Sequence, residues 1–298
     1  MNNKLTINWD IDNKKLIYLR SIVQISDVEI SFNRDFAYPD VWIFENNKDG
    51  TNIKEIYKLA QRTNIIIIYY IREPILSIKD FSYYYTQLSK IGILLVNTYE
   101  DILFILKKLS IIKSNFTGLN GLIKIITKPE TKEEEIILSK HSISVGDISN
   151  KIAYFMGEKK SEIKTTGYLH DLGKIFIPTS LLFSDKKLNK DEITIFQQHV
   201  KWGEFLLKQL FSEETFKTIF EGVSLHHERL NGSGYTRGIQ KIPEIAKVIA
   251  VADTYTSLTN NLNSKEILPS DVAVTYISAK EKELFDPEVV NVFKKIIL

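Results

Sequence analysis

Short apolar runs alternate with helical patterns in the first part of the chain. Three of the runs are rich in β-branched and aromatic residues and are bounded by polar positions, which predicts buried strands. They are Val41–Phe44, Ile65–Tyr70 and Ile91–Val96. Residues of helical period lie between and after them, over Ile53–Arg62, Ser82–Lys90 and Tyr99–Leu109. Strands that alternate with helices predict a parallel sheet with helices on its faces.

From Pro129 onward the strand signals fade and helical periodicity dominates. A long helix is predicted over Lys132–Phe155, because acidic residues in its first turn complement the helix dipole. Asn189, followed three residues later by Glu192, predicts another helix start. We therefore predict two domains, an α/β regulatory or interaction domain at residues 1–122 and an all-α bundle at residues 123–298.

All five histidines lie in the predicted helical half, and acidic residues accompany them. The group consists of His141, His170, His199, His226 and His227, with Asp171 and Asp253. One such histidine beside an apolar stripe is usually a core or surface residue. Seven together indicate a metal centre, because neutral imidazole is the commonest metal ligand near pH 7.

The stripe beside His199 is one of the apolar faces on which this prediction rests. Its predicted members recur at helical spacing and continue through a single helix from Asn189. They are Ile193, Phe196, Val200, Gly203 and Leu207. The stripe beside His141 is predicted to comprise Val145, Ile148, Ile152 and Phe155.

Composition narrows the chemistry. The chain of 298 residues is 44% hydrophobic and 26% charged, with a net charge of +2, so nothing in its charge indicates binding to a nucleic-acid polymer or a membrane. It has no cysteine, so a metal ion would need nitrogen and oxygen ligands, a set that suits iron, manganese, zinc or nickel. No signal-peptide pattern is present, and the apolar runs are shorter than the roughly 20 residues that span a bilayer. We expect a cytoplasmic protein.

An ordered set of motifs runs through the second half. They are His170-Asp171-Leu172-Gly173-Lys174, His226-His227-Glu228-Arg229, Gly232-Ser233-Gly234-Tyr235, Val251-Ala252-Asp253 and Phe285-Asp286-Pro287. Together they resemble the HD-GYP subgroup of the HD phosphohydrolase superfamily, over residues 135–298. A bare His-Asp pair would be a weak signal, whereas the ordered set is specific.

The resemblance implies an HD-type helical bundle that hydrolyses cyclic di-GMP to a linear dinucleotide or to GMP. It implies two divalent ions, iron or manganese, on the seven His and Asp residues above, with Asp171 bridging them. Asp171 and Lys174 would be catalytic, and Lys174 would contact a substrate phosphate. Such two-metal chemistry predicts in-line attack on phosphorus by a metal-bridged hydroxide. Further substrate contacts would come from Gly234, Tyr235 and Lys265.

Several positions depart from the family pattern. Thr236 stands where proline is usual and Asn231 where aspartate is usual. Thr256 and Leu262 replace an aspartate and a substrate-binding arginine, for which Lys265 is a partial substitute. Ile137 replaces the glutamate of three-metal members, which favours two ions. The sequence therefore predicts an intact metal cage with an altered substrate-binding periphery.

The first domain weakly resembles a receiver domain of response regulators. Pro39–Phe44 is similar to the third receiver strand, and Glu45 follows where the phosphoacceptor aspartate belongs. The acidic pair after the first strand is not evident, and Asn97 lies near the position of the usual lysine. This predicts a degenerate receiver that no longer takes phosphate. The alternative is an unrelated α/β interaction domain; either would serve a protein signalling partner or a homodimer.

Three functions follow as alternatives. The first is a cyclic-dinucleotide phosphodiesterase regulated by its N-terminal domain, which the Gly-Ser-Gly-Tyr loop favours. The second is a phosphohydrolase of the same fold for another nucleotide, which Thr256 and Leu262 favour. The third is a weakly active or inactive interaction module, which Thr236 and Asn231 permit. Seven retained ligands oppose the third alternative, because a buried polar cluster is energetically expensive.

Overall fold

The computed structural model describes fifteen stretches of the chain. They are residues 5–10, 30–32, 41–45, 66–70, 85–89, 93–96, 98, 101–102, 104–106, 108–109, 133–158, 162–184, 186–212, 216–260 and 267–298. The chain divides into two units. The first comprises Met1–Leu122, Ile175–Leu182 and Leu188–Gln198, and the second comprises Ile123–Lys174, Phe183–Lys187 and His199–Leu298. Helices α8 (Thr179–Leu182) and α9 (Lys190–Gln197) therefore group with the N-terminal sheet.

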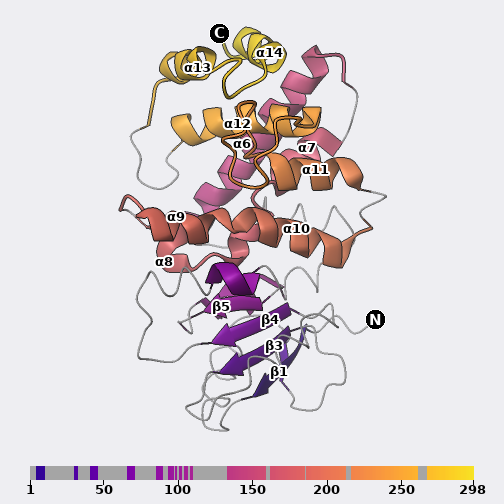
Figure 1. Cartoon of the computed structure of the whole chain (residues 1–298), viewed down its shortest axis with the longest axis vertical. Coiled ribbons are helices and arrows are strands. Elements are labelled where there is room, and N and C mark those ends of the chain that lie inside the picture. Colours follow the sequence, from indigo (N-terminus) through magenta and orange to yellow (C-terminus); the bar gives the residue numbers. More distant parts are fainter. Residues whose placement is uncertain are drawn as a thin grey trace. The chain divides into compact units, whose positions relative to one another are not determined.

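The sheet of the first unit has five parallel strands in the order β2-β1-β3-β4-β5 (Figure 1). The strands are β1 (Leu5–Asp10), β2 (Ile30–Phe32), β3 (Val41–Glu45), β4 (Ile66–Tyr70) and β5 (Ile93–Val96). This is the doubly wound, flavodoxin-like order. The three strands expected from apolar runs are confirmed as β3, β4 and β5.

The sequence patterns missed β1 and β2. Polar and apolar residues mix in the first, Leu-Thr-Ile-Asn-Trp-Asp, and the second has only three residues, so neither forms an apolar run. Of the helices expected beside the strands, residues 85–89 are helical, as are the described residues of 101–109. The helix expected at Ile53–Arg62 lies outside the described residues.

Four hydrogen bonds that involve side chains hold the later segments inside the first unit. The hydroxyl of Tyr85 donates to the carbonyl of Phe176 at 2.9 Å. The carboxylate of Asp101 accepts from the backbone N–H and the hydroxyl of Thr179 at 2.7 and 2.9 Å. Ser89 donates to the side-chain oxygen of Gln198 at 3.1 Å. The segment around α8 and the end of α9 are thus bonded to N-terminal residues.

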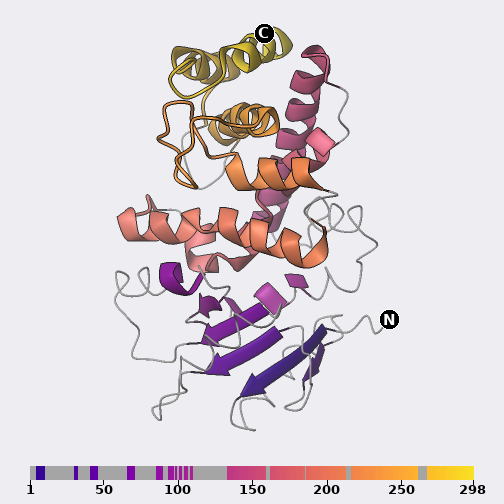
Figure 2. The ribbon, with the colours of Figure 1, turned by 45° about the vertical axis from the view of Figure 1, so that its right-hand side comes forward.

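The named elements in the described part of the second unit are all helices. They are α6 (Glu133–Phe155), α7 (Glu162–Leu169), α10 (His199–Leu210), α11 (Lys217–Leu225), α12 (Glu244–Thr259), α13 (Ser270–Ala279) and α14 (Pro287–Ile297). The short 3-10 helix η1 (Leu172–Phe176) begins in the second unit and ends in the first. Figure 2 shows α13 and α14 next to each other at the C-terminal end. The all-helical prediction for this half is confirmed.

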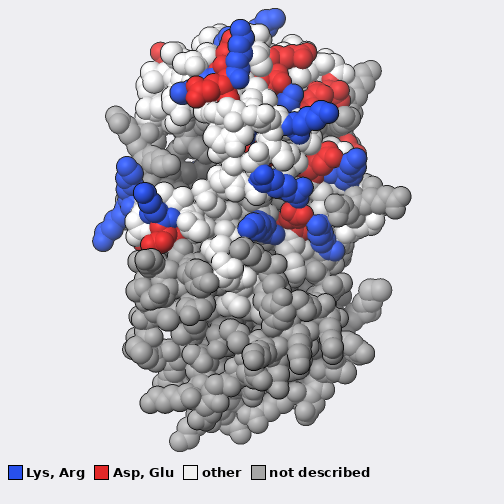
Figure 3. Space-filling view, viewed as in Figure 1, with Lys and Arg blue, Asp and Glu red and all other residues white. Residues whose placement is uncertain are grey.

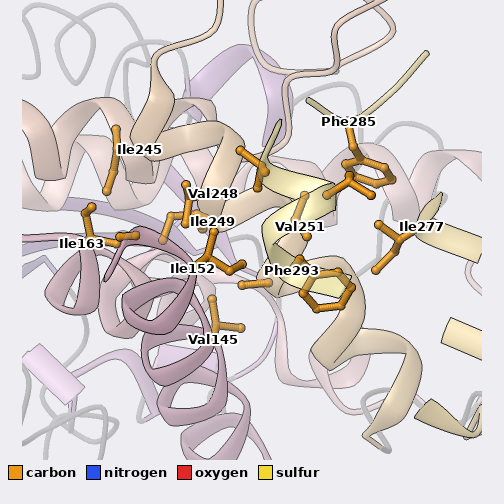
Figure 4. Close-up of a cluster of buried hydrophobic side chains, with 14 of the residues drawn as sticks. Val145, Ile152, Ile163, Ile245, Val248, Ile249, Val251, Ile277, Phe285 and Phe293 are labelled. Atoms are coloured by element: carbon orange, nitrogen blue, oxygen red, sulfur yellow. The ribbon is translucent and has the colours of Figure 1, made fainter. Parts of the chain in front are cut away.

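The main apolar core of this unit surrounds α12. Val248, Ile249 and Val251 of α12 meet side chains of α6, α7, α13 and α14 (Figure 4). Phe293 of α14 is fully buried in this cluster. Burying one such side chain contributes roughly 1.5–3 kcal/mol. The cluster thus stabilises α6 and α12, the helices that carry the predicted ligands His141 and Asp253.

The predicted helix from Asn189 is divided at Gln198 into α9 and α10. Its predicted start is confirmed, because Asn189 and Glu192 form a reciprocal capping box at 3.0 and 2.7 Å. Ile193 was wrongly assigned to the core stripe: it is 41% exposed, whereas Ile195 is fully buried. The predicted stripe assumed one continuous helix, but the break at Gln198 changes which face of α9 is buried relative to α10. Phe155 is also exposed, since it ends α6.

Two glycines allow unusually close backbone contacts between ligand-bearing segments. A Cβ on Gly167 of α7 would lie 2.5 Å from the Cα of Gly146 in α6. A Cβ on Gly173 would overlap the carbonyl oxygen of His199 and the backbone nitrogen of Gly203. Any larger residue would force these main chains apart, because close-packed interiors cannot absorb an added carbon without displacement.

Surface charges of the helical unit are mixed in sign. Lysines and arginines lie among aspartates and glutamates on the face shown in Figure 3. Neighbouring opposite charges pair within helices, as in Lys208–Glu204 at 2.8 Å on α10. On that face no single sign of charge dominates, which agrees with the small net charge. Among the described residues, no helix has both the length and the apolar character needed to cross a membrane.

Replacing Gly173 by alanine is expected to lower the free energy of unfolding by about 3 kcal/mol, the upper end of the overpacking range, because the obstacles are main-chain atoms. Urea denaturation measures the loss. Gly157→Ala is the control: its φ is +82° and nothing lies within 4 Å, so only about 1 kcal/mol of backbone strain is expected. Equal losses in the two variants would contradict the close contact.

Asp286 is expected to stabilise α14 in a pH-dependent way. Its carboxylate accepts from the N–H of Glu288 at 3.0 Å and from Lys247 Nζ at 2.7 Å. Burial acts to raise its pKa, but Lys247 and the helix N–H groups outweigh burial and lower it. The stabilisation is therefore present above the unfolded pKa of about 3.9 and is lost as pH falls through the lower folded pKa.

At pH 7, Asp286→Ala is expected to lower the free energy of unfolding by about 1–2 kcal/mol, because it loses both the cap and the ion pair. Asp286→Asn should lose less, since asparagine keeps the cap. Denaturation at several pH values checks this. A difference between wild type and Asp286→Asn that persists unchanged at pH 2 would show that the ion pair does not contribute.

Candidate metal centre

The seven predicted ligands converge from five segments of the helical unit. His141 lies in α6, His170 and Asp171 follow α7, and His199 begins α10; His226 and His227 follow α11, and Asp253 lies in α12. The side chains of His141, His170 and His199 are at most 1% exposed. Burial of so many polar groups in one place is uncommon without a shared partner.

Four of these side chains form a first cluster. His141 Nε2 lies 3.2 Å from His170 Nε2 and 3.1 Å from Asp253 Oδ1. Asp171 Oδ2 lies 3.1 Å from His170 Nε2 and 3.5 Å from His141 Nε2. Ligand atoms with metal bonds of about 2.1 Å are spaced about 3.0–3.4 Å apart around one ion. These separations therefore fit donors that share a single cation.

A second cluster consists of His199, His226 and His227, whose ligand atoms lie within 4.8 Å of one another. His199 Nε2 is 3.3 Å from Asp171 Oδ1. One oxygen of Asp171 thus faces the first cluster and the other faces the second. A carboxylate placed in this way can bridge two ions.

Backbone carbonyls orient two of the imidazoles. His170 Nδ1 lies 2.7 Å from the carbonyl of Gly167, and His226 Nδ1 lies 2.9 Å from that of Val223. A carbonyl only accepts, so Nδ1 carries a hydrogen in both rings and Nε2 is the nitrogen that faces the cluster. His226 Nε2 is buried and meets no hydrogen-bond partner among the described atoms. Outer carbonyls that fix a ligand tautomer in this way are typical of metal-binding histidines.

Burial and charge favour neutral imidazoles beside ionised carboxylates. Burial, helped by the neighbouring His170 and His199, lowers the pKa of His226 to about 3. Burial also lowers the pKa of His227. Although burial alone would raise it, His170 and Lys174 hold the pKa of Asp171 well below its usual range. Lone pairs and negative charge are therefore both directed at the cluster.

His170 shows how strongly the two neighbouring carboxylates favour positive charge in this site. Burial opposes protonation of His170, but Asp171 and Asp253 outweigh burial and raise its pKa to about 10. Hydrogen bonds to His141 and His170 likewise hold the pKa of Asp253 low against the effect of burial. Nitrogen and oxygen donors around two carboxylates fit iron, manganese, zinc or nickel.

Some of the predicted catalytic and substrate-binding residues lie next to the clusters, and others lie outside the described residues. Lys174 donates to Asp171 Oδ2 at 2.5 Å, and the ring of Tyr235 lies 4.6 Å from that of His227. Gly234 precedes Tyr235 in the same loop, and a Cβ on Gly234 would lie 2.7 Å from the carbonyl oxygen of His227. Thr256 is fully buried, and its hydroxyl donates to the carbonyl of Ala252 in its own helix. Lys265 and Leu262 lie outside the described residues, as does the side chain of Ile137.

Sequence patterns missed the role of Glu228. Its side chain is 1% exposed, and its carboxylate accepts from the backbone N–H groups of Arg237 and Ile239. The available signal was its place directly after His226-His227, in a loop with several glycines. No periodic pattern reveals a hydrogen bond between a side chain and a backbone group nine residues away.

Several known proteins are similar to this chain. It is 35% identical over 150 residues to the cyclic di-GMP phosphodiesterase response regulator RpfG of Xanthomonas campestris pv. campestris, which covers 48% of this chain and 39% of that protein. It is 34% identical over 125 residues to the 3'3'-cGAMP-specific phosphodiesterase 1 of Vibrio cholerae, over 40% of this chain and 28% of that protein. The chain thus spans well under two thirds of the length of these relatives.

An HDG"Y"P protein from Bdellovibrio bacteriovorus aligns with a TM-score of 0.45 at 14% identity, over 85% of this chain and 74% of that one. Residues 133–289, more than half of the chain, match the HD domain family. The matched stretch contains all seven residues of the two clusters. The chain therefore belongs to the HD domain family.

Proposed function

We propose that this protein is a metal-dependent phosphodiesterase that hydrolyses a cyclic dinucleotide, cyclic di-GMP, to a linear dinucleotide or a mononucleotide. The observation that carries the proposal is the position of Asp171, whose two oxygens face two separate groups of histidines. Relatives named as cyclic di-GMP and 3'3'-cGAMP phosphodiesterases support it. We further propose that the cofactors are two ions, iron or manganese.

In this proposal, one ion would be held by His141, His170 and Asp253. The other ion would be held by His199, His226 and His227. Asp171 would contribute a ligand to each ion. When bound, such ions activate water and stabilise the charge that develops on phosphoryl oxygens. The protein supplies orientation, because carbonyls of Gly167 and Val223 fix two of the imidazoles.

Two further side chains are placed to act on the substrate itself. The ammonium group of Lys174, hydrogen-bonded to Asp171, can interact with a phosphate oxygen beside the metal cluster. The ring of Tyr235, next to His227, offers an aromatic face on which a nucleobase can stack. Lys174 would thus serve the reacting phosphate and Tyr235 the base.

A related substrate is the second candidate. Thr256 replaces a charged residue of the family pattern, and its hydroxyl is turned back onto its own helix. It therefore offers no charge to a guanine dinucleotide. Some of the relatives are named for 3'3'-cGAMP rather than cyclic di-GMP. A panel of cyclic dinucleotides, with other nucleotide phosphoesters as the third group, separates these candidates.

We also propose that the N-terminal unit is a degenerate receiver that regulates the enzyme. The parallel strand order 2-1-3-4-5 and the position of Glu45 at the end of β3 support this. Within this unit, Asp101 bonds to Thr179 and Ser89 bonds to Gln198, which directly precedes His199 in the chain. A signalling partner or a second copy bound to this unit would then influence residues next to a proposed metal ligand.

Asp171→Ala is expected to lower kcat/KM for cyclic di-GMP by more than about 100-fold and to reduce bound metal, because one residue serves both clusters. Elemental analysis and turnover on the same anaerobically purified sample measure this. Asp147→Ala on α6 is the matched control, since its carboxylate is 46% exposed and pairs with Lys164. About two ions per chain with no turnover of any cyclic dinucleotide would argue for another phosphoester. A wild-type protein that binds no metal would overturn the mechanism.

Asp101→Ala is expected to reduce kcat/KM several-fold without changing the metal content, because Thr179 loses two hydrogen bonds of about 1 kcal/mol each and the proposed regulatory unit is held less firmly. Steady-state kinetics and elemental analysis check this. Ser184→Ala is the control, because its hydroxyl makes only a local hydrogen bond with Lys186. Unchanged kinetics in Asp101→Ala would argue against regulation through this contact.

A further inference from the structure

The loop between α11 and α12 wraps around one buried carboxylate. Glu228 is 1% exposed. Its Oε1 accepts from the N–H of Arg237 at 2.6 Å, and its Oε2 accepts from the N–H of Ile239 at 2.9 Å. Burying an ionised carboxylate is unfavourable unless hydrogen bonds compensate it, so the buried position and the loop conformation depend on each other.

The middle of the loop passes directly against the same residue. A Cβ on Gly234 would lie 2.5 Å from the Cα of Glu228 and 2.7 Å from its Oε2. Only glycine leaves room for this approach. Glu228 therefore contacts the loop at three points, through Gly234, Arg237 and Ile239.

Two side chains carried by this loop reach elements that hold proposed metal ligands. The ring of Tyr235 lies 4.6 Å from that of His227, with an interplanar angle of 31°. Arg237 Nη2 lies 3.3 Å from both carboxylate oxygens of Glu204 in α10, the helix that begins with His199. Tyr235 remains 38% exposed, so part of the side chain is accessible to a ligand.

Thr236, in the middle of this loop, increases the dependence on Glu228. A proline at this position would fix φ near −65° and so restrict the loop by itself. Threonine has an unrestricted φ, and its backbone can adopt alternatives. Other contacts must therefore select the conformation of this part of the loop, and Glu228, at the start of the loop, accepts two hydrogen bonds from it through its carboxylate.

We propose that Glu228 is a positioning residue that holds Tyr235 over the metal cluster and thereby sets the affinity for the cyclic dinucleotide. This inference rests on the proposed function and adds to it. Glu228 accepts hydrogen bonds from the loop and acts on the substrate only through Tyr235. Its loss should therefore weaken substrate binding and leave the metal cluster and the chemical step intact.

The test uses the full-length, metal-loaded protein with Glu228→Gln, which preserves shape but places an amide NH₂ opposite a backbone N–H. KM for cyclic di-GMP is expected to rise about tenfold, with kcat and metal content within about twofold of wild type. Glu221→Gln is the matched control: it makes the same change on α11, where the carboxylate pairs only weakly with Lys217 at 3.8 Å. A fall in kcat at unchanged KM, or a loss of metal, would overturn the proposal.

A double-mutant cycle tests whether Glu228 acts through Tyr235. Tyr235→Leu alone should also raise KM, and the double variant should be no worse than the more affected single variant. Effects that multiply would show that Glu228 acts independently of Tyr235, which would also overturn the proposal.

Hydrogen exchange separates this inference from the proposed function. In Glu228→Gln the amides of Arg237 and Ile239 should exchange about tenfold faster, while those of α11 should not change. Unchanged exchange at these two amides would refute the anchoring role whatever the substrate. A wild-type enzyme that turns over no cyclic dinucleotide would instead refute the proposed function and the affinity claim, with the exchange rates still deciding whether Glu228 anchors the loop.

Discussion

The cluster of seven His and Asp side chains depends on backbones that approach more closely than side chains would normally allow. Gly146 and Gly167 bring α6 and α7 together near His141 and His170, and Gly173 brings the segment after Asp171 against the start of α10. Imidazole and carboxylate side chains are short, so their ligand atoms meet only if the main chains are this near. The site therefore requires glycine at these contacts as well as the His and Asp side chains themselves.

Once the segments are this close, electrostatics decides what can occupy the space between them. Asp171 and Asp253 stay ionised despite burial, while His226 and His227 are held neutral. Such a group repels an anion and favours a cation. The two oxygens of Asp171 lie between the two sets of histidines, with Oδ2 near His141 and His170 and Oδ1 near His199.

Much of this could be predicted from the sequence, for identifiable reasons. Strands β3 to β5 are continuous apolar runs, the start of α9 carries a capping pair, and the seven His and Asp residues occupy an ordered motif series. Strands β1 and β2 lack apolar runs, and the break at Gln198 interrupts no obvious pattern. Glu228 was missed because its partners are backbone N–H groups nine and eleven residues away, which no residue type encodes.

The seven proposed metal ligands and the proposed substrate contact Tyr235 are positioned by different parts of the structure. Metal binding and substrate preference can therefore change independently of each other. Cage residues sit in helices or directly at their ends, where neighbouring turns restrict each side chain. Tyr235 instead lies on a loop whose conformation relies on Glu228 and a few close backbone contacts. Changes at Thr236 or Thr256 leave every ligand of the two clusters in place. Under the proposed function, departures from the family pattern at the periphery would therefore alter the preference for one dinucleotide over another without removing any proposed metal ligand.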